Sequence, residues 1–138
     1  MRGKNSGLPF ILARWKAPTT LKIFLTLWYV LEHVEDPFGL LNEVHRILRW
    51  GGILGVAVPN LRSLYRFVAP ERWMEERKKQ RHHLYDFEPR TLRALLQKCG
   101  FSVCAMTGEG KMARNRVSRA LVGRLRLGNV LVAFARKA

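Results

Sequence analysis

Polar side chains follow two apolar runs of the chain, residues 23–30 and 53–58, and could line a binding site. In open α/β sheets, ligands bind at the carboxyl ends of the strands, so side chains at the ends of two such strands would lie at one edge. The side chains concerned are Tyr29, Glu32, His33, Asn60 and Arg62. Three more could join them from a later segment, namely His82, His83 and Tyr85.

The histidines are the residues of this group best suited to acid–base chemistry. His33 could deprotonate a hydroxyl or amine of a substrate, or it could be a turn residue bonded to the backbone. His83 could line the pocket of that substrate, and Asn60 could bind it or simply form a turn. The sequence contains no spacing typical of a metal site, a phosphate loop or a nucleophile elbow, so we predict no metal.

A strand, a helix and a second strand must position these residues. Residues 23–30 form a continuous apolar run that favours a strand buried on both faces. Asp36 can cap a helix that begins at Pro37, and the helix carries apolar residues at helical spacing up to Leu48. We expect Arg49 in the last helical turn and Gly51 at a left-handed exit, before the strand at 53–58. This order predicts a βαβ unit in a parallel sheet.

The second half of the chain continues the same pattern. Residues 61–83 are mixed, and the charge-rich stretch 71–81 is either a solvated helical face or a mobile cover over a ligand cleft. A helix opens at Pro89 and closes at Gly100, and strands are expected at 101–107 and 129–135. No core helix separates these last strands, which favours antiparallel pairing at one edge of the sheet. An apolar stripe that includes Val117, Leu121 and Leu125 marks another helix between them.

Composition fits a single globular domain with an uneven charge. The chain has 138 residues, 48% hydrophobic content and two cysteines, which suit reduced core thiols rather than a disulfide framework. No run reaches the ~20 apolar residues of a membrane span, and we expect a cytoplasmic protein. Residues 1–31 and 110–138 hold five and eight basic residues and no acidic ones, so they supply +13 of the net charge of +15. Such ends could attract nucleic acid or an anionic membrane surface.

Three stretches together resemble the C-terminal half of the class I S-adenosylmethionine-dependent methyltransferases that act on small molecules. They are LWYVLEHVEDPFGLLNEVHRILRWGG, ILGVAVPN and RHHLYDFEPRTLRALLQKCGF. Tyr29 stands where a histidine is common in that family, and Trp50 where a proline is common. The resemblance covers residues 24–107, with a last strand at 129–136.

The resemblance implies an α/β fold, a partial Rossmann-like sheet of about four strands flanked by helices. Most strands would be parallel, with the last one antiparallel beside its neighbours. S-adenosylmethionine would be the cofactor, touched by Leu27, Trp28 and Tyr29. The methyl acceptor, an unidentified small molecule, would meet Glu32, Asn60 and Tyr85, with His33 and His83 as catalytic residues.

The family's glycine-rich turn and ribose-binding acidic residue have no counterpart in this sequence. We therefore expect residues 23–138 to form the C-terminal half of a methyltransferase-like domain, and residues 1–22 an irregular basic segment. The hypothesis is a truncated or incomplete enzyme, with the missing half encoded upstream. A second copy or a partner chain would cover the exposed edge of the sheet. The alternatives are a basic module that binds nucleic acid or an anionic membrane, and an inactive remnant that needs a partner.

Overall fold

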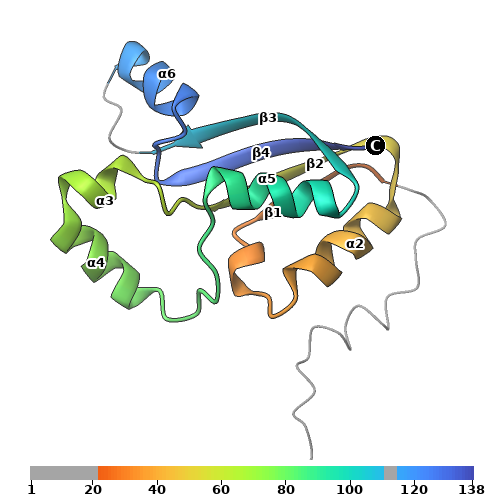
Figure 1. Ribbon diagram of the computed structural model, residues 1–138, viewed down its shortest axis with the longest axis horizontal. Helices are drawn as coiled ribbons and strands as arrows, with labels where there is room; N and C mark the ends of the chain where they lie inside the picture. The colour runs from red at the N-terminus through yellow and green to blue at the C-terminus, as the bar shows by residue number, and fades with distance from the viewer. Residues whose placement is uncertain (1–21, 111–114) are drawn as a thin grey trace, which may run out of the picture.

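The computed structural model describes residues 22–110 and 115–138, which form a four-stranded sheet with helices packed against it (Figure 1). The strands are β1 (Lys22–Trp28), β2 (Leu48–Pro59), β3 (Phe101–Glu109) and β4 (Val130–Lys137), in the order β1-β2-β4-β3 across the sheet. The irregular segment expected at 1–22 lies outside the described residues except for Lys22, the first residue of β1.

The strand directions confirm the predicted fold class. β1 and β2 pair in parallel, whereas β4 pairs antiparallel with both β2 and β3. β1, β2 and β3 therefore run the same way, and only the last strand is reversed. The antiparallel pairing of β3 and β4, expected because no core helix separates them, is also present.

Helices occupy every connection between the strands. They are the 3-10 helix η1 (Leu31–His33), α2 (Pro37–Ile47), α3 (Leu64–Val68), α4 (Pro70–Lys79), α5 (Pro89–Lys98) and α6 (Arg116–Arg124). None of the helices within the described ranges is long and apolar enough to cross a membrane.

Helix α2 begins as predicted but ends earlier. The Asp36 side chain accepts a hydrogen bond from the Gly39 amide at 2.8 Å, and Pro37 occupies the first turn. The helix stops at Ile47, and β2 starts at once with Leu48. Arg49 therefore lies in β2 and not in the last helical turn. Lys22 pairs with Leu48 but Phe24 with Ile53, so residues 49–52 bulge from the ladder, and Gly51 takes a φ of 74° there instead of terminating the helix.

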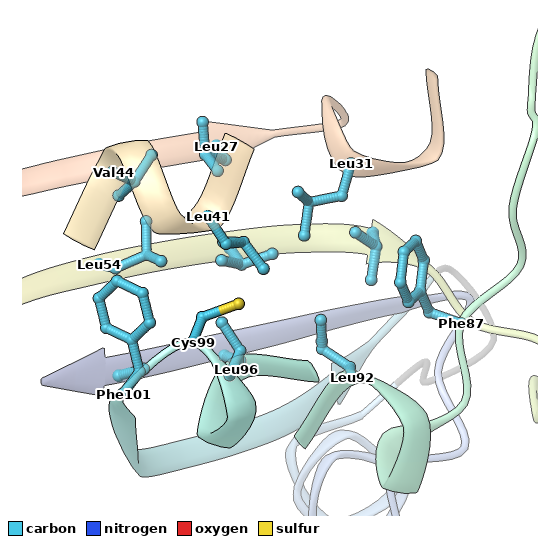
Figure 2. Packing of buried hydrophobic residues seen from close by; sticks show 14 of the residues in the cluster. Leu27, Leu31, Leu41, Val44, Leu54, Phe87, Leu92, Leu96, Cys99 and Phe101 are labelled. Atoms are coloured by element: carbon cyan, nitrogen blue, oxygen red, sulfur yellow. The ribbon is translucent and has the colours of Figure 1, made fainter. Parts of the chain in front are cut away.

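The hydrophobic core lies between one face of the sheet and helices α2 and α5 (Figure 2). α2 contributes Leu41 and Val44, and α5 contributes Leu92 and Leu96, which have no exposed surface. The sheet supplies the alternate residues of its central strands, namely Leu54, Val56, Val58, Leu131, Ala133 and Ala135. Leu31 of η1 closes the same core near the carboxyl end of β1.

Strand β1 is much more exposed than an apolar run suggests. The prediction that it is buried on both faces is wrong, because only Leu27 is buried in it. β1 pairs with β2 alone and so forms one edge of the sheet. Ile23, Phe24 and Trp28 remain 63%, 54% and 49% exposed, since no described element covers these side chains.

Candidate functional site

Hollows lie at the carboxyl ends of β1 and β2, where the sequence placed a binding site. One has a volume of about 410 Å³ and is lined by residues from the ends of four strands and from helices α3 and α4. Its lining residues are Tyr29, Pro59, Tyr65, Glu76, Gln80, Gly110, Asn129 and Val130. A second hollow of about 640 Å³ shares Tyr29, Gly110 and Val130 with it and extends over the sheet towards α6. A ligand at this edge would contact both central strands and the α3–α4 segment.

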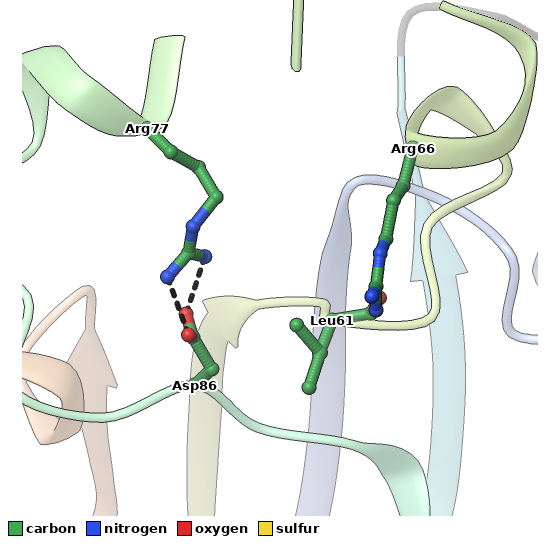
Figure 3. A network of polar contacts seen from close by, with 4 residues as sticks. All are labelled: Leu61, Arg66, Arg77 and Asp86. Atoms are coloured by element: carbon green, nitrogen blue, oxygen red, sulfur yellow. Dashed lines mark hydrogen bonds and ion pairs between the residues drawn. The ribbon is translucent and has the colours of Figure 1, made fainter. Parts of the chain in front are cut away.

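Helix α4 forms one wall of this site. Arg77 makes a bidentate ion pair with Asp86, which ties α4 to the segment that leads into α5 (Figure 3). The Arg77 guanidinium also lies 4.9 Å from the centroid of the Trp73 ring. Of the two interpretations of residues 71–81, the geometry favours the cover over a cleft, although most of the helix is also exposed.

The three predicted cofactor contacts differ in accessibility. Leu27 packs in the core and is 8% exposed, whereas Trp28 and Tyr29 are each 49% exposed. Tyr29 has a φ of 53° and its amide donates to the Ala57 carbonyl at 2.9 Å, so the chain turns sharply at the end of β1. Partial burial raises the pKa of the Tyr29 phenol, and the charge of Glu32 adds to that effect.

Glu32, His33 and His83 come together beside η1. One ligand atom from each lies within 4.8 Å of the others. Glu32 is fully buried, and neither carboxylate oxygen has a hydrogen-bond partner among the described residues. Burial raises the pKa of the Glu32 carboxyl, and burial together with His33 lowers the pKa of His83. Glu32 therefore faces two imidazoles and not the open cleft in which the sequence placed it.

Backbone and side-chain hydrogen bonds hold the segment that carries His83 against η1. The Leu84 amide donates to the Glu32 carbonyl at 2.7 Å, and His33 Nδ1 donates to the His82 carbonyl at 2.9 Å. The Tyr85 hydroxyl donates to the Glu35 carbonyl at 2.8 Å. The two rings of His33 and His83 pack edge to face, with centroids 4.7 Å apart. His33 and His83 thus lie side by side, and neither they nor Tyr85 line the hollows described above.

Asn60 serves as a buried link between two loops. Its amide nitrogen donates to the carbonyls of Arg126 and Gly128 at 2.8 and 2.7 Å, and its oxygen accepts from the Arg62 amide at 3.0 Å. The side chain is 4% exposed. Both amide protons are used within the protein, which leaves none for an acceptor molecule.

Sequence reasoning did not single out the residues of α3 and α4 that line the hollows. Tyr65, Glu76 and Gln80 belong to this group, and the Tyr65 hydroxyl lies 3.4 Å from a Glu76 carboxylate oxygen. A charge-rich helix carries no periodic signal for the side that faces a cleft. Pro70, in the first turn of α4, marks only where that helix begins.

Comparison with known proteins shows the family to which the chain belongs. The family model for the methyltransferase domain matches residues 12–105, which is most of the chain. The chain belongs to the methyltransferase domain family. No curated protein matched the sequence.

Solved structures share the fold of this methyltransferase domain. An S-adenosylmethionine-dependent methyltransferase from Thermotoga maritima, described as a possible histamine N-methyltransferase, has a TM-score of 0.61 and 22% identity over 88% of this chain. A second such enzyme, from Archaeoglobus fulgidus, has a TM-score of 0.61 and 16% identity over 98% of the chain. The magnesium protoporphyrin IX methyltransferase of Synechocystis, solved with bound S-adenosylhomocysteine, has a TM-score of 0.54 and 13% identity over 92% of it.

The methyltransferase domain described here spans only part of these relatives. It covers 60% of the Thermotoga chain, 66% of the Archaeoglobus chain and 48% of the Synechocystis chain. The sheet order and the single reversed strand agree with the class I fold that the sequence resembles. The cofactor of that class is S-adenosylmethionine.

The described residues offer groups that would suit one side of such a cofactor. Trp28 and Tyr29 offer exposed aromatic surfaces at the strand ends, and Glu76 and Glu109 line the hollows with carboxylates. A glycine-rich turn and an acidic residue for the ribose hydroxyls are not found within residues 22–110 and 115–138. These residues would therefore supply one wall of a cofactor site and not a complete cradle.

Proposed function

We propose that this chain contributes the acceptor-side wall of an S-adenosylmethionine-dependent methyltransferase that acts on a small molecule. The observation that carries the proposal is the hollow at the carboxyl ends of β1 and β2, with Tyr29 in its lining. Strained backbone of the kind found at Tyr29 is concentrated at functional sites. Family membership supports the reaction class, and the acceptor is left as a small molecule of unspecified structure.

The cofactor would supply an electrophilic methyl group on a sulfonium sulfur. The protein's part is to hold an acceptor lone pair in line with that methyl group and to exclude water, which by itself can provide much of the acceleration. His33 is the residue we propose as a base for the acceptor proton, and His83 lies beside it. Glu32 and Tyr85 do not line the hollows, so they would act on the acceptor only through the segments they hold in place, and Asn60 would act through the loops it joins.

Trp28→Ala should weaken the binding of S-adenosylhomocysteine about tenfold, because an exposed aromatic wall would be lost from the cofactor side of the site. A tenfold change corresponds to about 1.4 kcal/mol of binding free energy. Isothermal titration of the full chain with S-adenosylhomocysteine measures the effect.

Trp50→Ala is the matched control for this titration. Trp50 is 70% exposed but lies in the bulge at the other end of β2, away from the strand ends. The control should bind like the wild type. Absence of saturable binding at millimolar ligand, or equal weakening in both variants, would contradict the proposed site.

We further propose that additional polypeptide covers the β1 edge, either a second copy or a partner chain. An edge strand can pair through its backbone with another chain, and the exposed side chains of Ile23, Phe24 and Trp28 could pack against that chain. One of the similar structures is a complex between the Haloferax volcanii Trm112 methyltransferase activator and a putative methyltransferase, with a TM-score of 0.57 and 17% identity over 86% of this chain.

Phe24→Lys should shift the purified chain from an oligomer towards a monomer, because a charge would then lie on the edge that pairs. Light scattering after size exclusion measures the mass of each species. Val68→Lys, at a site that is 61% exposed in α3, should leave the mass unchanged. A monomeric wild type would refute self-association and leave a partner chain as the occupant.

A second candidate function is binding to an anionic membrane surface, and helix α6 favours it. Val117, Leu121 and Leu125 recur every four residues and are 78%, 57% and 55% exposed. Arg116 and Arg124 flank this stripe. A basic amphipathic helix of this kind can lie in a membrane interface.

Leu121→Glu should reduce co-sedimentation with vesicles that contain phosphatidylserine at least threefold, because a carboxylate would replace an apolar contact with the interface. Binding should also fall steeply as salt is raised. Equal binding to neutral vesicles, or to nucleic acid at the same salt, would argue against this function.

Two expectations from the sequence stay predictions: that the protein is cytoplasmic, and the alternative that it is an inactive remnant that needs a partner.

A further inference from the structure

Glu32, which lies in a cluster with His33 and His83, is buried without a hydrogen-bond partner for its carboxylate in the described part of the chain. A buried carboxylate without hydrogen bonds is costly unless a proton or a cation neutralises it. Neither oxygen of Glu32 has a partner among the described residues, although the residue has no exposed surface. The nearest basic nitrogen is His33 Nε2, at 3.8 Å from Glu32 Oε1, which is beyond hydrogen-bonding distance.

Each of the two histidines has a ring nitrogen that makes no hydrogen bond among the described residues. His33 uses Nδ1 to donate to the His82 carbonyl, so in the neutral ring Nε2 carries the lone pair on the side of Glu32. Histidines that bind metals usually donate their other ring N–H to a carbonyl or carboxylate, and this bond fixes the orientation of the ring. His83 Nδ1 is buried and has no partner within the described ranges.

We propose that Glu32, His33 and His83 form a binding site for a divalent transition-metal ion. One ligand atom from each residue lies within 4.8 Å of the other two, so modest side-chain rotation brings all three to one ion. Two imidazoles and one carboxylate suit zinc, iron(II), cobalt(II) or manganese(II) better than magnesium or calcium, which prefer oxygen ligands only.

A hydrogen bond and an ion pair fix the backbone around the site even without a bound ion. The bond from the Leu84 amide to the Glu32 carbonyl joins the two segments that carry the ligands. The Arg77–Asp86 ion pair fixes the same segment from its other end. The His33 side chain is 41% exposed, which gives an ion a route from solvent to the buried carboxylate.

Three protein ligands leave at least one position on the ion for water or another oxygen or nitrogen donor, as in catalytic metal sites. The metal site does not rest on the methyl transfer proposed above, and the two give His33 different roles, because an ion would take the Nε2 lone pair that a base needs.

Cobalt and zinc titrations of the chelator-treated full chain test the site without cofactor or acceptor. Cobalt(II) should bind one per chain with visible absorption bands typical of nitrogen and oxygen ligands, and zinc should displace it. Glu32→Gln and His83→Gln should each weaken zinc binding by at least ~100-fold, as expected when a ligand itself is lost. Magnesium at millimolar concentration should not compete.

His82→Gln is the matched control, because its side chain lies next to His83 in sequence but outside the cluster. The control should keep zinc affinity within about twofold, since the His82 carbonyl that orients His33 is retained. Circular dichroism of each variant separates loss of a ligand from loss of folding, and Glu32→Gln keeps the shape of the side chain.

Two results would overturn the proposal. The first is a folded wild-type chain that binds neither cobalt nor zinc at ~1 mM. The second is zinc binding that survives both Glu32→Gln and His83→Gln, which would place the ion elsewhere in the chain. Failure of the metal titration leaves the S-adenosylhomocysteine titration unaffected, so the two proposals fail separately.

Discussion

Leu41→Ala should lower the free energy of unfolding by about 2–5 kcal/mol, the usual range for a buried leucine that leaves a cavity. Leu41 has no exposed surface and lies at the centre of the layer between α2 and the sheet (Figure 2). Because α5 packs on the same layer, neither helix can close the cavity without losing its own contacts. Urea denaturation followed by circular dichroism measures the change.

Leu121→Ala is the matched control, since it makes the same substitution in a helix at a position that is 57% exposed. Its effect should remain within about 0.5 kcal/mol. A loss at Leu41 no larger than at Leu121 would mean that α2 does not pack on the sheet as described, and would remove the support for η1 and Glu32.

Asn60→Ala should lower the free energy of unfolding by about 2–4 kcal/mol, because it leaves two carbonyls and one amide, all at least partly buried, without the Asn60 side chain as a partner. The carbonyls belong to Arg126 and Gly128, in the turn that leads into β4. The loss should therefore loosen the lining of the hollow at Asn129 as well as the global fold. Chemical denaturation gives the global effect, and hydrogen exchange at residues 126–130 gives the local one.

Asn42→Ala provides the comparison, because Asn42 is exposed on α2 and its loss should change stability by less than about 0.5 kcal/mol. The same pair of variants separates a structural role of Asn60 from a role in binding the acceptor. An Asn60 variant with unchanged stability but weaker acceptor binding would show that the side chain contacts the acceptor.

Local sequence signals predicted the elements but not what covers them. Helix α5 was predictable because Leu92 and Leu96 recur at helical spacing, and Gly100 then takes the φ of 83° that suits an exit. The burial of β1 was not predictable, since an apolar run looks the same in the middle of a sheet and at its edge. The early end of α2 was missed because Gly51 serves a bulge whose register depends on pairing with β1.

The candidate site was likewise predictable only in part: its residues could be named from the sequence, but not their contacts. Glu32, His33 and His83 were each named from the sequence, but their meeting depends on hydrogen bonds between segments far apart in the chain. Metal-ligand spacing rules look for donors close together in sequence, so they give no signal for a set completed by a distant loop. The sequence left open whether α4 is a solvated helix or a cover over a cleft, because its charged residues suit solvent and a polar cleft alike.

The position of β4 has a consequence for the order in which the sheet forms. β4 is the last strand in sequence, yet it lies between β2 and β3 and supplies all the pairing that joins them. Until β4 is in place, β3 has no strand to pair with. Pairing over such long sequence separations is slow, and unpaired edges favour aggregation in the meantime. The sheet should thus close late in folding, because β2 and β3 are joined only when β4 pairs with both.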